Sequence, residues 1–265
     1  MAPLLRGAAF ITGAAKGLGQ ATATAFARHG VSRLAIADID MHGLQKTREL
    51  LRAQYPEVKV MKLQLDVRHS EQVEEGLSEV VRKFGRLDIA VNNAGIGGSG
   101  MRTHEMPNAE WNKIADVDLF GVWRCQREEL AIMVDQEDLG VREGRGRIIN
   151  VSSMYGLKAT GPHLPSTPYV ASKHGVIGLT KADANSYGDM NIRINAICPG
   201  YVKTPLLADS DIPPDSYIGR DLERTALKRL GMIEEVTDAI VFLASPMSSY
   251  MQGAALVVDG GYSSQ

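Results

Sequence analysis

The chain has 265 residues, of which 44% are hydrophobic and 23% are charged, a composition typical of a globular protein with one large domain. Its 29 basic and 31 acidic residues nearly balance, and the net charge of -2 provides no field that would attract nucleic acid or an anionic membrane. No apolar run approaches the roughly 20 residues that a membrane span requires, so we expect a cytoplasmic protein.

The N-terminal stretch MAPLLRGAAFITG is apolar, but Arg6 and Gly7 interrupt it before a glycine-rich turn. A signal peptide would carry a continuous apolar core and a cleavage site, so we predict a strand here. Cys125 and Cys198 lie far apart in sequence and are expected to be reduced thiols. The six histidines form no H-E-x-x-H pattern and the cysteines no C-x-x-C pattern, so we predict no metal site.

Seven short apolar runs follow one another along the chain, and segments with helical periodicity, such as 21–29 and 71–84, separate the first of them. In chain order these runs read GAAFIT, RLAIAD, VKVMKLQL, RLDIAVNN, GRIINVSS, IRINAIC and AALVVDG. Strands that alternate with helices predict parallel β-α-β units with right-handed crossovers. We therefore predict an α/β fold: one domain over 1–265 with a doubly wound (Rossmann-type) sheet of about seven parallel strands and helices on both faces.

One late segment interrupts this rhythm. Residues 203–230 contain prolines and no strand pattern, and they follow a predicted strand where a lid over a pocket would lie. Several apolar residues of this segment and of the loop at 97–101 predict a mainly apolar ligand. They are Met101, Leu206, Leu207, Ile212, Tyr217 and Ile218.

The first predicted strand ends in the glycine-rich turn ITGAAKGLG. Gly13, Gly17 and Gly19 permit a tight turn and a close approach of the backbone to a pyrophosphate at the start of a helix. The spacing is G-x-x-x-G-x-G, which differs from the broader G-x-G-x-x-G fingerprint, and a purely structural turn is the alternative. The strand–turn–helix context favours a dinucleotide site.

Asp38 stands at the end of the second predicted strand, where a carboxylate can accept hydrogen bonds from a ribose and would repel a 2′-phosphate. The alternative role is a helix cap, for which Asp40 is the better candidate. Lys16 favours NADP instead, because a cation in the turn could pair with a 2′-phosphate. A carboxylate facing a phosphate is the stronger effect, so NAD is favoured over NADP.

Seven motifs occur in order: T-G-x-x-x-G-x-G at 12–19, LDV at 65–67, NNAG at 92–95, VSS at 151–153, YVASK at 169–173, PGYVKTP at 199–205 and VDGG at 258–261. In these motifs, taken together and in this order, the chain resembles the short-chain dehydrogenase/reductase family nearly from end to end. The resemblance implies that Asp66 and Val67 border the adenine and that Val202 and Thr204 contact the nicotinamide carboxamide. It also implies that these further residues bind the cofactor: Thr12, Leu18, Asn93, Ala94, Gly95, Pro199 and Gly200.

Tyr169 and Lys173 are four residues apart in a predicted helix from 168 to 187, so they share one helical face. Unperturbed tyrosine ionises at about pH 10, and an ammonium about 4 Å away favours the phenolate by about 4 kcal/mol at an effective dielectric constant of about 20. Such a tyrosine can act as a general base and, in reverse, as a general acid. Alone, the pair would suggest two surface residues. With the other motifs it predicts a proton-transfer pair whose lysine, as the resemblance implies, also holds the nicotinamide ribose.

Ser153 is predicted to end the fifth strand, at the carboxyl edge where doubly wound sheets bind ligands. Its hydroxyl can donate to a substrate oxygen. Ser152 is the competing candidate, and the family pattern points to Ser153. The linker to Tyr169 is about three residues longer than is common in the family, and we expect the excess to bulge around 161–165 beside the substrate pocket.

Asp118 departs from the family, which commonly has asparagine at this position. The resemblance implies that this residue holds, through its backbone carbonyl, a water that connects the lysine to solvent. A carboxyl side chain lacks the amide donors and can carry a charge, so we expect a working but retuned relay.

The sequence therefore predicts an NAD(P)-dependent enzyme that transfers a hydride between the cofactor and a secondary alcohol or ketone, and whose substrate is apolar or cyclic. The catalytic residues would be Ser153, Tyr169, Lys173 and Asp118. The alternative is a catalytically impaired dinucleotide-binding sensor or interaction protein, which Asp118 alone motivates. The apolar C-terminal strand and the resemblance suggest a homodimer or homotetramer.

Overall fold

A computed structural model describes residues 3–98, 100–204 and 212–264. Seven parallel strands form one sheet in the order β3-β2-β1-β4-β5-β6-β7. The strands are β1 (Ala8–Thr12), β2 (Arg33–Asp38), β3 (Lys59–Gln64), β4 (Ile89–Asn92), β5 (Gly146–Val151), β6 (Ile192–Pro199) and β7 (Ala255–Val258). The prediction of a doubly wound α/β sheet is confirmed. All seven predicted strands are present, within two or three residues at their ends.

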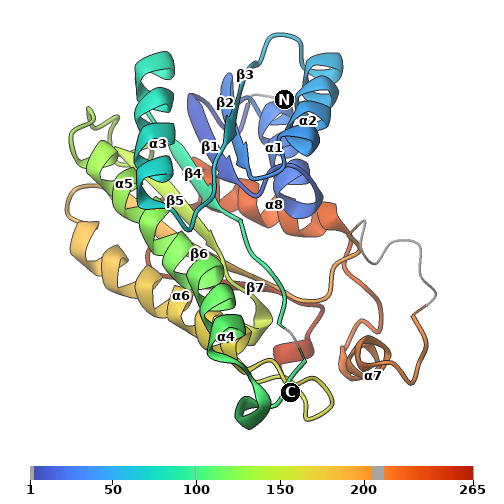
Figure 1. Cartoon of the computed structure of the whole chain (residues 1–265). Coiled ribbons are helices and arrows are strands. Elements are labelled where there is room, and N and C mark those ends of the chain that lie inside the picture. The colour runs from blue at the N-terminus through green and yellow to red at the C-terminus, as the bar shows by residue number, and fades with distance from the viewer. Residues whose placement is uncertain (1–2, 99, 205–211, 265) are drawn as a thin grey trace.

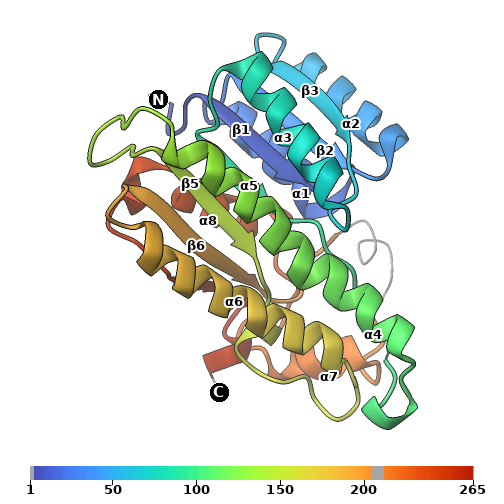
Figure 2. The ribbon, with the colours of Figure 1, turned by 60° about the vertical axis from the view of Figure 1, so that its left-hand side comes forward.

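Helices cover both faces of the sheet (Figures 1 and 2). The α-helices are α1 (Gly17–Arg28), α2 (Met41–Gln54), α3 (Ser70–Phe84), α4 (Asn108–Ala115), α5 (Val122–Val134), α6 (Thr167–Tyr187), α7 (Tyr217–Arg224) and α8 (Ile233–Ala244). Residues of α1, α2 and α8 pack in one core cluster, and residues of α3, α5 and α6 pack in the other. None of the helices in the described residues is long and apolar enough to cross a membrane.

The strands are apolar on both sides, as a sheet between two helical layers requires. Ile11 and Ile36 contribute to the cluster under α1 and α8, whereas Phe10 and Ala35, their neighbours in sequence, contribute to the other. Strand order reverses between β1 and β4, which are neighbours in the sheet. Ligands of doubly wound sheets bind outside the carboxyl ends of the strands at such a reversal.

The helix that carries Asp118 is not regular. Between α4 and α5 lies a six-residue π-helix, η2 (Asp116–Gly121), so the three segments form one long helix with a widened turn. Gly121 lies where a Cβ would be 2.6 Å from a Val67 methyl group, which shows how closely this turn packs on the loop after β3. π-Helical turns are rare and occur frequently at functional sites.

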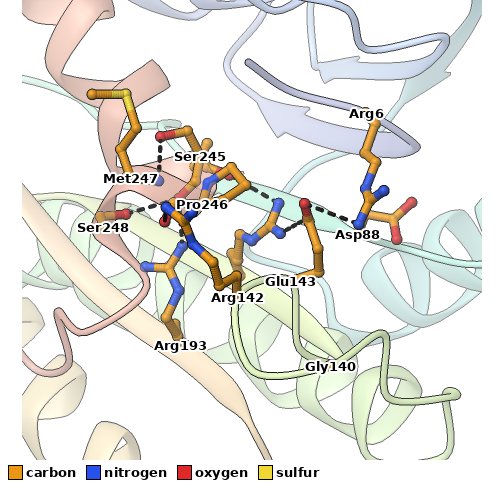
Figure 3. A network of polar contacts seen from close by, with 12 residues as sticks. Arg6, Asp88, Gly140, Arg142, Glu143, Arg193, Ser245, Pro246, Met247 and Ser248 are labelled. Carbon is orange, nitrogen blue, oxygen red and sulfur yellow. Dashed lines mark hydrogen bonds and ion pairs between the residues drawn. The ribbon is translucent and has the colours of Figure 1, made fainter. Parts of the chain in front are cut away.

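At the opposite edge, where β5 and β6 begin, buried arginines bind the end of α8. Arg193 donates to two backbone carbonyls there, at 3.0 and 3.1 Å, and Arg147 donates to a third at 3.0 Å. Glu143 pairs with Arg147 and, at 2.9 Å, with Arg6. Figure 3 shows Arg193, Glu143 and Arg6 in this network. Cations at a helix C-terminus complement its dipole, so the network stabilises this edge of the fold.

A second polar network lies in the core between β4, β5, α5 and α6. The Asn92 side chain donates to Glu129 and to Asn150, both at 3.0 Å. Asn150 in turn donates to Gln126 at 2.6 Å and to Thr180 at 2.9 Å. Glu129 is 0% exposed, and burial raises its pKa to about 8, against the hydrogen bond from Asn92 that lowers it. Glu129 is therefore held protonated at neutral pH.

This carboxyl predicts a pH-dependent stability. A folded-state pKa of about 8 against an ordinary 4.5 means that unfolding releases a proton between these values, so stability is lost as pH rises toward 8. The Glu129→Gln variant keeps an acceptor for Asn92 without that proton. We expect its free energy of unfolding in urea to exceed that of the wild type by up to about 4 kcal/mol at pH 8.5 and to match it within about 1 kcal/mol near pH 5.

The matched control is Glu74→Gln, an exposed position on α3. It should leave the pH dependence of stability unchanged. Parallel stability curves for Glu129→Gln and the wild type between pH 5 and 8.5 would contradict the prediction.

Candidate active site

The turn after β1 brings its glycines together with the start of α1. Gly13 and Gly17 have φ of +66° and +58°, in the left-handed region that favours glycine. A Cβ on Gly19 would lie 2.2 Å from the Gly13 carbonyl oxygen, so this residue lets the helix pack on the turn. A Cβ on Gly17 would meet open space. The N-cap residue of α1, Lys16, makes no capping hydrogen bond with its side chain, so the first backbone N–H groups of this helix suit an anion.

Thr12 and Asn93 join this turn to the loop after β4. The Thr12 hydroxyl oxygen accepts hydrogen bonds from the backbone N–H groups of Asn93 and Ala94, both at 3.0 Å. The Asn93 side chain donates back to the carbonyls of Thr12 and Gly13 at 3.0 and 3.1 Å. These four bonds explain why the two motifs occur together, because each holds the other's backbone in place.

Asp38 lies at the end of β2, as predicted, and its carboxylate holds the turn. One oxygen accepts from the Ala15 N–H and the other from the Asp40 N–H, both at 3.0 Å. Asp40 is the helix cap: its side chain accepts from Gly43 at the start of α2. The two aspartates therefore have different roles, and Asp38 faces the glycine turn.

These residues line a cavity of about 820 Å³ along the carboxyl ends of β1 to β4. Of the predicted cofactor residues, the lining includes Thr12, Gly13, Gly17, Asp38, Asp66, Val67, Asn93, Ala94, Gly95 and Thr204. It also includes three cations, Lys16, Arg68 and Lys113, of which sequence reasoning had considered only Lys16. Arg68 binds Asp66 through both carboxylate oxygens, which lowers the pKa of Asp66.

Ser153 and Ser152 differ in their partners. The prediction that Ser153 ends β5 is wrong by two residues: the strand ends at Val151, and Ser153 begins the 3-10 helix η3 (Met154–Gly156). The turn arises because the Ser153 hydroxyl oxygen accepts from the Tyr155 N–H at 3.1 Å. Among the described residues this hydroxyl donates no hydrogen bond of its own. The Ser152 hydroxyl instead donates to the Lys173 carbonyl at 2.9 Å and so fixes α6 against β5.

Lys173 is the charged centre of the site. It is 4% exposed, and its ammonium donates to the Val151 carbonyl at 3.1 Å. The same nitrogen lies 5.6 Å from the Tyr169 ring centroid and 3.9 Å from an oxygen of Asp118. A Cβ on Gly95 would lie 3.4 Å from it, so the glycine of NNAG leaves room for the lysine.

Asp118 lies behind the lysine and is 0% exposed. One of its oxygens accepts from the Ile96 N–H at 2.7 Å, and the other has no hydrogen-bond partner among the described residues. Burial raises the pKa of Asp118, against the opposing effects of Lys173 and Ile96. The side chain of this residue, and not only its backbone, is therefore part of the site's electrostatics.

This geometry predicts the effect of Asp118→Asn. The amide keeps an acceptor for Ile96 but removes the negative charge that, when ionised, offsets the field of the Lys173 ammonium at the Tyr169 hydroxyl. The phenolate should then form at lower pH. We expect the acidic limb of the pH profile of kcat/KM for alcohol oxidation to move down by about one pH unit.

Asp116→Asn is the matched control, because Asp116 belongs to the same π-helix but pairs with Arg124 at 2.7 Å. Its profile should coincide with that of the wild type. An Asp118→Asn profile that stays in place, or that moves to higher pH, would contradict the proposed role of the carboxylate.

A second cavity of about 530 Å³ joins the first through Asn93, Gly95, Ile96 and Thr204, which line both. Its lining includes the predicted residues Leu18, Ser153, Tyr169, Lys173, Pro199, Gly200 and Val202. Gly19 and Asp118 are the two predicted site residues that line neither cavity, since they lie behind the walls. The long linker contributes Thr160, Leu164 and Ser166, and Gly161 and Leu164 form a turn there.

The apolar residues predicted to face the ligand are only partly at this cavity. Tyr217 of α7 lines it, but Met101 and Ile212 do not, and Ile218 is buried against the body of the protein. Leu206 and Leu207 lie outside the described residues. Tyr155 and Tyr201, which sequence reasoning missed, supply the aromatic wall instead. The sequence signals for them were weak: Tyr201 lies inside the motif at 199–205, and Tyr155 lies two residues after the motif at 151–153.

The first cavity fits a dinucleotide in its chemistry. A turn of backbone N–H groups at a helix N-terminus suits a pyrophosphate, and the carboxylate of Asp38 suits ribose hydroxyls. A Cβ on Gly17 would point into open space in this cavity. The glycine therefore keeps free a volume that any other side chain would occupy.

Comparison with known proteins agrees with this geometry. Residues 13–263 match a family model described as enoyl-(acyl carrier protein) reductase. The chain is 37% identical to the 3-oxoacyl-(acyl-carrier-protein) reductase FabG of Thermotoga maritima, over 95% of each chain. It is 35% identical to the cyclohexanol dehydrogenase of Acinetobacter sp., over 97% of this chain and 95% of that protein.

The fold also matches solved structures. The crystal structure of levodione reductase aligns with a TM-score of 0.88 at 32% identity, over 97% of this chain and 98% of that one. Both the sequence and the fold are thus shared over almost the whole length. The chain belongs to the short-chain dehydrogenase/reductase family, and it is therefore an oxidoreductase of CH–OH and C=O groups that depends on a nicotinamide cofactor.

Proposed function

We propose that this enzyme interconverts a secondary alcohol and a ketone on an apolar or cyclic substrate, with NAD favoured over NADP. The observation that supports the proposal most is that Tyr169, Lys173 and Ser153 all line the smaller cavity, which shares four lining residues with the larger one. A substrate oxygen at this wall would be within reach of a proton donor, a proton acceptor and a cation.

In this mechanism the Ser153 hydroxyl binds the substrate oxygen and stabilises the charge that develops on it. Tyr169 removes the alcohol proton in oxidation and returns it in reduction. Lys173 stabilises the Tyr169 phenolate electrostatically, while Val151 and Asp118 hold the lysine in place. The nicotinamide supplies the carbon that accepts or donates the hydride.

We propose that the residues lining the larger cavity hold the cofactor, together with Lys173 and the loop after β6. The glycine turn and α1 would bind the pyrophosphate, and Asp66 and Val67 would border the adenine. Asp38 supports the choice of NAD, because a carboxylate in this position would repel a 2′-phosphate. Lys16 and Arg68 line the same cavity, and their positive charges would favour a 2′-phosphate. The preference for NAD over NADP therefore rests on the carboxylate of Asp38 alone.

An apolar or cyclic substrate is supported by the aromatic wall of the smaller cavity, from Tyr155, Tyr201 and Tyr217. It is also consistent with relatives named for cyclohexanol and levodione. The test is NADH formation from a panel of cyclic and aliphatic secondary alcohols, with NAD and NADP compared. Retained NADH binding without turnover of any alcohol or ketone would overturn the proposal and favour the alternative, a dinucleotide-binding sensor.

The chain is further proposed to be one domain, in which 203–230 form the substrate lid, and to assemble as a homodimer or homotetramer. Phe120 and Trp123, exposed at 49% and 41% on the long helix, and Val257 on the edge strand β7 support an oligomer. Mass measurement by light scattering tests this, and a monomer would contradict it. A cytoplasmic location stays a prediction, for cell fractionation to test.

A further inference from the structure

A buried carboxylate belongs to the proposed lid. Asp221 on α7 is 0% exposed, and three tyrosine hydroxyls donate to it. Tyr155 and Tyr201 bind one oxygen, each at 2.9 Å, and Tyr262 binds the other at 3.1 Å. These tyrosines come from three segments: η3 after β5, the loop after β6, and the C-terminal 3-10 helix η5 (Tyr262–Ser264).

The geometry of this cluster indicates a fixed arrangement. The three rings are mutually perpendicular, with centroids 6.1 to 6.4 Å apart and interplanar angles of 82° to 85°. A buried carboxylate requires several donors to compensate for its lost hydration. His163 and Arg224 also lie near it, at 3.3 and 3.9 Å. Since His163 belongs to the long linker, the carboxylate connects that linker to the lid.

The tyrosines act here as permanent donors. Burial raises the pKa of Tyr155 and of Tyr201, so both hydroxyls keep their protons across the working pH range. The two hydroxyls also lie 2.8 Å from each other. Every polar atom of these two side chains is thus engaged within the cluster.

Two of these tyrosines line the smaller cavity, which we proposed as the substrate site. Tyr155 and Tyr201 line the smaller cavity with Ser153 and Tyr169, whereas Asp221 does not line it. The hydroxyls therefore point to a group behind the wall, and the wall presents ring carbons to the cavity. An apolar ring of a substrate would pack there, and a polar substituent would lose its hydration without gaining a partner.

We propose that Asp221 is a positioning residue that sets substrate specificity: by holding the hydroxyls of Tyr155 and Tyr201 it makes this wall apolar and selects substrates without a polar group at that end. The inference deepens the proposed function and rests on it. It identifies the substrate class as ring alcohols or ketones whose portion next to these two tyrosine rings is hydrocarbon.

The test compares Asp221→Asn with Glu223→Gln. Both variants remove one carboxylate from α7, but Glu223 is exposed and pairs only with Lys228 among the described residues. The substrates are cyclohexanol and cyclohexane-1,4-diol, which carries a second hydroxyl across the ring. The asparagine offers one acceptor oxygen to three hydroxyls, so at least one tyrosine hydroxyl must turn to another partner.

We expect wild type and Glu223→Gln to prefer cyclohexanol in kcat/KM by about ten-fold or more, and Asp221→Asn to lose most of this preference through KM. kcat and the Kd of NADH should stay within about three-fold of the wild type, because the reacting groups do not touch Asp221. An Asp221→Asn variant with the same preference as Glu223→Gln would overturn the inference.

If Asp221→Asn does not fold, Tyr262→Phe removes one donor from outside the substrate cavity. It should lower the preference by about two- to three-fold, and an unchanged preference would overturn the inference. A wild type that binds NADH without turnover would refute the proposed function instead. In that case, hydrogen exchange of the α7 backbone amides tests whether Asp221 holds this helix and the tyrosines in position. Exchange about ten-fold faster in Asp221→Asn than in Glu223→Gln supports the positioning role of Asp221, and equal rates overturn it.

Discussion

Replacing Tyr169 by phenylalanine is expected to lower kcat for alcohol oxidation by about 1,000-fold while NADH binding stays within about two-fold of the wild type. Phenylalanine keeps the ring that lies 5.6 Å from the Lys173 ammonium and that packs in the aromatic cluster with Tyr155 and Tyr201. The variant removes only the hydroxyl that carries the proton. The loss should appear in kcat and not in KM, because the hydroxyl acts on the reacting oxygen and the cavity keeps its shape.

Tyr187→Phe is the matched control, since Tyr187 ends the same helix and is only partly buried against the core. Its kcat should equal that of the wild type. Steady-state rates for both variants, with a fluorescence titration of NADH, check the result. A Tyr169→Phe enzyme that retains a tenth or more of the activity would contradict a proton-transfer role for this tyrosine.

The sequence predicted the sheet and most of the residues that line the larger cavity because those features are local. A strand followed by Gly13, Gly17 and Gly19 has few ways to turn into a helix, and Asp38 ends the next strand whatever lies around it. The residues of the first cavity are thus encoded in short motifs at the carboxyl ends of successive strands.

The surroundings of the Asp118 carboxylate could not be predicted from the sequence. The residue type showed the departure from the family, but the π-helix, the bond to Ile96 and the 3.9 Å distance to Lys173 arise from how α4, η2 and α5 pack on their neighbours. The register of Ser153 was missed for a related reason. Its own hydroxyl binds the Tyr155 N–H and ends the strand early, and such a turn competes with strand pairing in a way that periodicity cannot show.

The cluster of Asp221 with Tyr155, Tyr201 and Tyr262 could not be predicted from the sequence. Asp221 is separated from Tyr155 by 66 residues and from Tyr262 by 41. Each is an ordinary residue in its own segment. Their convergence depends on where α7 and the C-terminus settle on the sheet. Apolar residues of the lid led to the prediction of an apolar ligand, but of those that the structure describes only Tyr217 lines the smaller cavity, together with Tyr155 and Tyr201.

Asp38 should control the choice between the two nicotinamide cofactors. We expect Asp38→Asn to change the ratio of kcat/KM for NAD over that for NADP by about 100-fold toward NADP, since a charge repulsion of about 3 kcal/mol is removed. Part of this change should be a decrease in kcat/KM for NAD. The carboxylate accepts from both the Ala15 and the Asp40 N–H groups, and an amide can accept from only one of them.

The gain with NADP should come from cations already in place, because Lys16 and Arg68 line the same cavity and can approach a 2′-phosphate. Asp40→Asn removes an equal charge two residues away. Asp40 also lines this cavity, but its exposed carboxylate caps α2, so this variant should change the ratio by no more than about three-fold. Initial rates with both cofactors at saturating alcohol measure these ratios. Equal changes in the two variants would mean that general charge sets the preference. An unchanged ratio in Asp38→Asn would mean that the carboxylate only braces the glycine turn and does not meet the ribose.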